Sequence, residues 1–148
     1  MTTPVQTRLR TAGIWIQGKA ILLESQVGRA VWGIPGGSLE ANETVEQGCI
    51  REYAEETGIE MNVIGMALIN ENIYRLDGKL MREYCFYCLV QPVLPALRAS
   101  LPVQSREAEI EFAWFPIAEV PRLTFGPTFL APLLPYLSSA TRFLSTVE

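Results

Sequence analysis

One segment of this chain, residues 44–57, has the composition of a helix, and β-prone runs lie on both sides of it. Asn42 and Thr44 are candidate N-caps, and Gly58 is a candidate C-terminal stop. The helix should lie on a sheet, because its apolar residues fall on one side. That predicted apolar side consists of Cys49, Ile50, Tyr53 and Ala54.

Three β-prone runs precede this helix and three follow it: residues 11–16, 20–24, 31–34, 63–75, 80–93 and 109–115. Gln17-Gly18-Lys19 predicts a hairpin between the first two runs, and Asp77-Gly78 predicts a second hairpin. The chain should turn at Pro35-Gly36-Gly37, and a loop should contain Pro95 and Pro102. This order of elements favours a mixed sheet with helices packed on it over a regular βαβ series.

Two helical stretches are expected in the last third of the chain. Residues 116–123 should form a short helical turn. Residues 128–144 have helical apolar spacing, but Pro132 and Pro135 predict a bent or split helix there.

The composition indicates one compact domain over residues 1–148, with 49% hydrophobic and 19% charged residues. No apolar run reaches the ~18 residues of a membrane span, and residues 1–10 are polar, so a soluble cytoplasmic protein is expected. The three cysteines should be reduced. Cys85 and Cys88 spell C-x-x-C, which could bind metal or run redox chemistry. On a strand, however, their sulfurs would point to opposite faces.

The chain has no histidine, which excludes histidine triads and histidine-bound zinc. The formal net charge of -4 and pI near 5.0 argue against a broad nucleic-acid surface, which needs clustered basic charge. A polyanionic substrate would therefore have to be bridged by cations.

Three carboxylates crowd one face of the predicted helix. Glu52, Glu55 and Glu56 lie within an arc of roughly 100° on an α-helix. Such a trio by itself is more often a solvated surface. Here Arg51 can orient a carboxylate by a bidentate hydrogen bond, and the adjacent glycine loop can approach the helix start closely. Clustered carboxylates with a backbone carbonyl suit a hard divalent cation.

The stretch between Gly37 and Ile59 resembles the Nudix box, G-x5-E-x7-R-E-U-x-E-E-x-G-U, in which U is a bulky aliphatic residue. The matching residues are Gly37, Glu43, Arg51, Glu52, Glu55, Glu56, Gly58 and Ile59. Two positions depart from the usual pattern: Tyr53 occupies the first U, and Gly48 stands where alanine is usual. The Tyr53 ring can still pack, but its hydroxyl needs a partner, while Gly48 permits close approach by a neighbour. The wider pattern extends roughly over residues 13–120.

The resemblance implies a Nudix-type α/β/α sandwich, α/β (α+β) in class, with a mixed central sheet flanked by helices. It also implies Mg²⁺, with Mn²⁺ as a possible substitute. The implied metal ligands are the Gly36 carbonyl, Glu52, Glu55 and Glu56, with Arg51 and Glu43 orienting them. The general base stays open between the box residues Glu52 and Glu55 and the later Glu107, Glu109 and Glu111, of which Glu111 is favoured as base or additional ligand.

The expected reaction is hydrolysis of a pyrophosphate bond in a nucleoside diphosphate derivative: a nucleoside triphosphate, a dinucleoside polyphosphate or a nucleotide sugar. Tyr74 and Arg82 are candidates for stacking on a base or contacting phosphate, although structural or solvent-facing roles are more common for such residues. A non-catalytic nucleotide-binding or regulatory module is the main alternative, and a plain interaction domain the remote one. The family also makes a homodimer possible.

Overall fold

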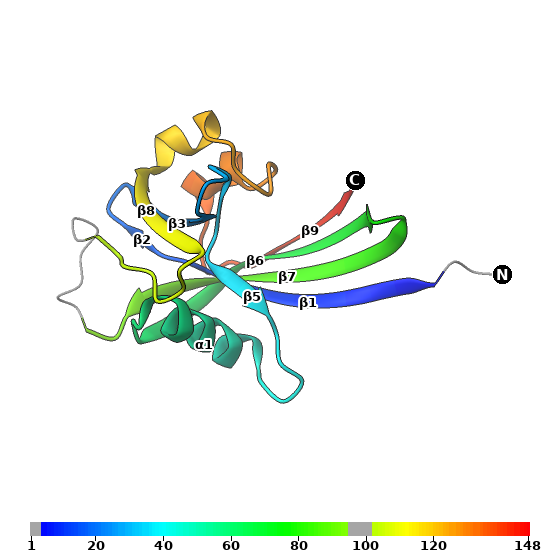
Figure 1. Cartoon of the computed structure of the whole chain (residues 1–148), viewed down its shortest axis with the longest axis horizontal. Coiled ribbons are helices and arrows are strands. Elements are labelled where there is room, and N and C mark those ends of the chain that lie inside the picture. Colours follow the sequence, from blue (N-terminus) through cyan, green and yellow to red (C-terminus); the bar gives the residue numbers. More distant parts are fainter. Residues whose placement is uncertain (1–3, 95–101) are drawn as a thin grey trace.

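The computed structural model describes residues 4–94 and 102–148, which contain two sheets (Figure 1). The larger sheet has the strand order β5-β1-β7-β6-β9. Its strands are β1 (Val5–Ile14), β5 (Gly36–Ser38), β6 (Met61–Leu76), β7 (Lys79–Pro92) and β9 (Arg142–Val147). β1 runs parallel to β7 and β9 parallel to β6, whereas β5 and the β6–β7 hairpin are antiparallel. The predicted mixed sheet is therefore confirmed.

The smaller sheet contains the first predicted hairpin. It consists of β2 (Ile16–Gln17), β3 (Ala20–Gln26), β4 (Trp32–Gly33) and β8 (Ile110–Pro116), with β3 paired to all three others. Both predicted hairpins are present. At the turn of the long one, Asp77 and Gly78 have φ values of 50° and 77°, the positive φ pair of a two-residue turn.

Helix α1 (Val45–Thr57) has the predicted bounds to within one residue. The Thr44 hydroxyl accepts a hydrogen bond from the Gln47 amide at 3.1 Å, and the Gln47 side chain accepts one from the Thr44 amide at 2.9 Å. This reciprocal capping box fixes the helix start. Gly58 ends the helix with φ 74°, the left-handed conformation that glycine adopts without strain.

The larger sheet separates two hydrophobic clusters. One cluster lies under α1 and includes Cys49, Tyr53 and Cys88. The other includes Cys85 with residues of the 3-10 helices η1 (Ile117–Arg122) and η2 (Ala131–Tyr136). Figure 1 shows α1 on one side of the sheet and η1 and η2 on the other, so the predicted arrangement of a sheet between helices is confirmed.

The cysteine interpretation also holds. Cys85 and Cys88 lie on β7 and belong to different clusters, as opposite faces of a strand require. Cys49, Cys85 and Cys88 are all free and buried. Of the helices in the described part of the chain, none is both long enough and apolar enough to pass through a membrane.

Four sequence predictions need correction. β1 begins at Val5 rather than at residue 11, because the polar residues 5–10 also pair in parallel with β7. Gly36 and Gly37 do not only turn but enter β5, where a side chain on Gly36 would collide with the Thr11 carbonyl oxygen. In α1, Ala54 is exposed.

The fourth correction concerns the C-terminal segment predicted to be helical over residues 128–144. Only η2 is helical there, with Pro132 near its start and Pro135 inside it. The chain then pairs as β9 with the edge of β6, a long-range contact that local spacing does not reveal. The predicted turn at 116–123 is present as η1, whereas Pro95 of the predicted loop lies outside the described residues.

Candidate active site

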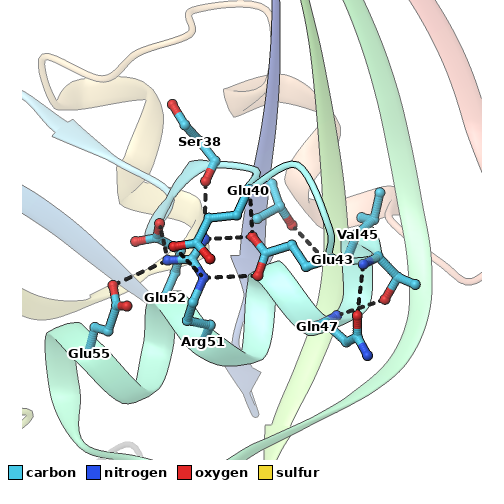
Figure 2. Close-up of polar contacts among 10 residues, drawn as sticks. Ser38, Glu40, Glu43, Val45, Gln47, Arg51, Glu52 and Glu55 are labelled. Carbon is cyan, nitrogen blue, oxygen red and sulfur yellow. Dashed lines mark hydrogen bonds and ion pairs between the residues drawn. The ribbon is translucent and has the colours of Figure 1, made fainter.

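Arg51 organises the acidic side of α1 (Figure 2). Its guanidinium donates two hydrogen bonds to Glu43, from Nε at 2.9 Å and from Nη2 at 2.7 Å. Nη1 donates to Glu52 at 3.0 Å and to Glu55 at 3.2 Å, and Nη2 also donates to the Ser38 carbonyl at 3.1 Å. The Arg51 guanidinium therefore joins the carboxylates of Glu43, Glu52 and Glu55, and it also connects α1 to β5.

Glu43 is the strongest partner of Arg51. The two hydrogen bonds from the guanidinium lower the pKa of the Glu43 carboxyl to about 2, so it stays ionised. Gly48 makes this geometry possible, because a side chain there would contact Glu43 Oε1 at 2.9 Å and collide with Leu39. The close approach expected at Gly48 is confirmed.

Gly37 creates the space for Glu52. A Cβ atom on Gly37 would collide with the Glu52 carboxylate, whose side chain is only 14% exposed. The Gly36 carbonyl, predicted as a metal ligand, is one residue away in β5. The box helix and the glycine strand therefore meet at one carboxylate.

Tyr53 fixes the height of α1 above β1. Its ring is fully buried and packs where a side chain on Gly13 would stand, and its hydroxyl donates a hydrogen bond to the Gly13 carbonyl at 2.6 Å. The hydrogen-bond partner expected for the Tyr53 hydroxyl is thus the backbone carbonyl of Gly13, in a strand of the larger sheet.

Glu56 points inward from α1 and is 5% exposed. Its carboxyl lies within hydrogen-bonding reach of Glu52 and of Glu24, which comes from β3. Burial, followed by the charge of Glu24, raises the pKa of Glu56 to about 10, and burial raises the pKa of Glu24 to about 7. Within the described part of the chain, Oε2 of each of these two residues has no hydrogen-bond partner.

This donor set fits a divalent cation. All the side-chain groups are carboxylates, the ligands that hard cations prefer, and the buried Glu56 Oε2 is an unused acceptor. Across residues 4–94 and 102–148, no three His, Cys, Asp or Glu side chains already have the arrangement of a metal site. Binding of a cation would therefore require the carboxylate side chains to change rotamer, because Arg51 forms ion pairs with Glu52 and Glu55 in this structure.

Two cavities adjoin this cluster and share Glu24 in their walls. The larger, about 380 Å³, is also lined by Trp32 and Glu109. The smaller, about 230 Å³, is lined mainly by polar residues that include Arg10, Asn72 and Glu83. Glu24 therefore stands between the box carboxylates and the space available to a ligand.

The later carboxylates predicted as candidate bases lie at different places. The charge of Glu107 acts on Glu24 and contributes to its raised pKa. Glu109 lines the larger cavity. Glu111 is exposed and pairs with Ser25, so it projects from the face of the smaller sheet opposite to Glu24. The structure does not bring Glu111 together with the box.

Tyr74 and Arg82 lie on opposite faces of the β6–β7 hairpin, because Arg82 pairs with the neighbour of Tyr74. The Tyr74 hydroxyl donates to Glu83, a residue of the smaller cavity, at 3.1 Å. Arg82 instead lies 4.0 Å from Glu71. The two residues therefore do not share one subsite.

Glu24 is the residue that sequence reasoning missed. It ends the apolar run of β3 and, two residues after Leu22, points to the same face as that fully buried side chain. A carboxylate on the inward face of a buried strand was the available signal.

The family model described as NUDIX domain matches residues 7–137. The chain belongs to the Nudix family. A relative of this Nudix protein, MutT4 of Mycobacterium tuberculosis, is 35% identical over 100 residues, which are 67% of this chain and 38% of that protein. The chain therefore spans well under half the length of that relative.

Solved structures similar to this Nudix protein share its fold. A MutT protein from Bacillus halodurans aligns with a TM-score of 0.70 and 22% identity, covering 92% of this chain and 86% of that one. An ADP-ribose pyrophosphatase from Streptococcus suis aligns with a TM-score of 0.58 and 16% identity, covering 93% and 98%.

Proposed function

We propose that this protein is a metal-dependent hydrolase that cleaves a pyrophosphate bond in a nucleoside diphosphate derivative. The observation that carries the proposal is the environment of Glu56. This side chain is only 5% exposed, one of its carboxylate oxygens has no hydrogen-bond partner among the described residues, and the carboxyl groups of Glu24 and Glu52 lie beside it. Packing alone does not favour such a cluster, because each buried negative charge costs free energy unless a proton or a cation compensates it. A cation site accounts for all three carboxylates.

Glu52, Glu55, Glu56 and the Gly36 carbonyl would hold the cation. When bound, a divalent cation neutralises phosphate oxygens and lowers the pKa of water. Arg51 would keep Glu52 beside Gly37, and Glu43 would keep Arg51 in place through its paired hydrogen bonds. Mg²⁺ is the proposed ion, with Mn²⁺ as a substitute, because both accept oxygen ligands.

For the general base, the geometry favours the box over Glu111. Glu52 and Glu55 are on the acidic side of α1, and Glu107 is near enough to influence Glu24. Glu111 points away from Glu24. A base must reach the attacking water, so we propose Glu52 or Glu55 for this role, with Glu107 and Glu109 as the alternatives from the later loop, since Glu109 lines the larger cavity beside Glu24.

We infer a small nucleotide as substrate from the family, and the two cavities beside the box, of about 230 and 380 Å³, are the space proposed for it. The Arg10 side chain lines the smaller one without a hydrogen bond or ion pair to another described residue, and it is available for an anionic or carbonyl group of the substrate. Nucleoside triphosphates lead the proposed panel, followed by dinucleoside polyphosphates and nucleotide sugars.

The test is a substrate panel assayed for phosphate-bearing products with Mg²⁺ and with Mn²⁺. Wild type should turn over at least one nucleotide, and Glu56→Gln should lose at least about a hundredfold in rate. Glu119→Gln, which removes an exposed acid from η1, is the charge-matched control. Equal rates for wild type and Glu56→Gln would sink the proposal, and nucleotide binding without turnover under either ion would favour the non-catalytic module.

A further inference from the structure

Glu24 has a position that the box does not explain. It comes from β3, and in register it stands opposite Phe112 of β8 and Gly33 of β4. Phe112 packs in the cluster under α1, so the Glu24 side chain is directed toward that helix. The same side chain lines both cavities beside the site.

The contact between Glu24 and Glu56 is between two acids. Their carboxyl groups are within hydrogen-bonding reach, and Oε2 of each lacks a partner among the residues described. A hydrogen bond between two carboxyl groups requires a proton on one of them. When both are ionised, they repel each other in a place that water reaches poorly.

No basic side chain pairs with these two acids in the described structure. The Arg51 guanidinium is occupied by Glu43, Glu52 and Glu55. Arg10 acts on Glu24 through its charge without forming an ion pair. The charge of the pair is therefore left for a bound cation or a proton to balance.

We propose that Glu24 is an additional ligand of the divalent cation, supplied from β3 and acting together with Glu56. The proposal rests on the proposed function of the box. Glu56 contributes a buried oxygen without a hydrogen-bond partner among the described residues, and Glu24, whose carboxyl group lies beside that of Glu56, contributes a second one. Because Glu24 also lines the cavities, it would hold the cation on the side of the site that is open to a substrate.

Direct Mn²⁺ binding distinguishes this role from a shared proton. Free Mn²⁺ is titrated with protein and followed by electron paramagnetic resonance, for wild type, Glu24→Gln, Glu24→Asp and the exposed, charge-matched Glu60→Gln. Glu24→Gln should weaken binding by about tenfold or more, or remove one ion per chain. Glu24→Asp should recover part of the loss, and Glu60→Gln should bind as wild type does.

Thermal melting provides a second measurement that does not depend on turnover. In EDTA, Glu24→Gln should melt no lower than wild type, because glutamine keeps a hydrogen-bonding partner for Glu56 and removes a buried acid. With Mn²⁺, wild type should gain more in Tm than Glu24→Gln does, because tighter binding stabilises the folded state more. A variant that unfolds too early in EDTA is replaced by Glu24→Asp in the same comparison.

The outcomes separate the two proposals. If Glu24→Gln binds Mn²⁺ with wild-type affinity and stoichiometry while Glu56→Gln does not, Glu24 is not a ligand and the proposed function stands. If wild type itself neither binds Mn²⁺ nor hydrolyses any nucleotide, the proposed function fails and the role of Glu24 fails with it.

Discussion

At the scale of single residues, the site contains acids in two opposite electrostatic states. Glu43 is held ionised by Arg51, with its pKa lowered to about 2. Glu56 and Glu24 instead have raised pKa values because burial disfavours their charged forms. Arg51 therefore accounts for the low pKa of Glu43, and burial accounts for the raised pKa values of Glu24 and Glu56.

The raised pKa values of Glu24 and Glu56 predict how the stability of the metal-free protein depends on pH. Their folded-state pKa values, about 7 for Glu24 and about 10 for Glu56, lie above the ordinary value of 4.5. The folded protein thus holds protons that the unfolded chain releases, so this contribution is complete below pH 4.5 and is lost as pH rises toward 10. The free energy of unfolding in EDTA should fall between pH 5 and 9, to be measured by urea denaturation with Glu24→Gln as the flatter control. A rise over this range in wild type relative to Glu24→Gln would contradict the assignment.

At the scale of elements, the site depends on the contact between α1 and β5. Gly37 is one of the residues through which they touch, beside the hydrogen bond from Arg51 to the Ser38 carbonyl, because its missing side chain leaves room for the Glu52 carboxylate. In this protein, packing therefore requires a glycine at the first position of the Nudix box. The same glycine sets the position of Glu52, a candidate ligand.

The corresponding prediction is that Gly37→Ala displaces Glu52 without unfolding the protein. Activity should fall at least about tenfold and Mn²⁺ affinity should weaken, because the added methyl group occupies the carboxylate position. Ser38→Ala is the matched control, since it shortens the next side chain and keeps the carbonyl that Arg51 uses. Wild-type activity in Gly37→Ala, with far-ultraviolet circular dichroism unchanged, would refute the packing argument.

At the scale of the whole molecule, local signals predicted the box helix and the long hairpin well. Thr44, Gly58 and Asp77-Gly78 act within a few residues, so their effects are readable from the sequence. The errors arose where pairing is distant in sequence. β9 joins β6 across more than 70 residues, and Glu24 meets Glu56 through the packing of β3 against α1.

The attachment of β9 can be tested directly. The Thr146 hydroxyl donates to Asn72 at 2.8 Å and accepts a hydrogen bond from the buried Asn70 amide at 3.2 Å. Thr146→Val removes both bonds, so amide hydrogen exchange in β9 should accelerate while α1 keeps its protection. Ser145→Ala, on the other face of the same strand, should have the smaller effect. Unchanged exchange in Thr146→Val would show that backbone pairing alone holds β9.

The tyrosine that replaces the usual aliphatic residue in the box has a mechanical consequence. Its ring rests on bare backbone at Gly13, on the face of β1 that also carries the side chain of Thr11 and is continued by that of Trp15, and its hydroxyl donates a hydrogen bond to the Gly13 carbonyl. Sliding in either direction along the strand would push the ring into a neighbouring side chain. Tyr53 therefore anchors the helix that carries Glu52, Glu55 and Glu56 to the middle of the sheet, so these acids keep their distance from β1 when the loops around them move.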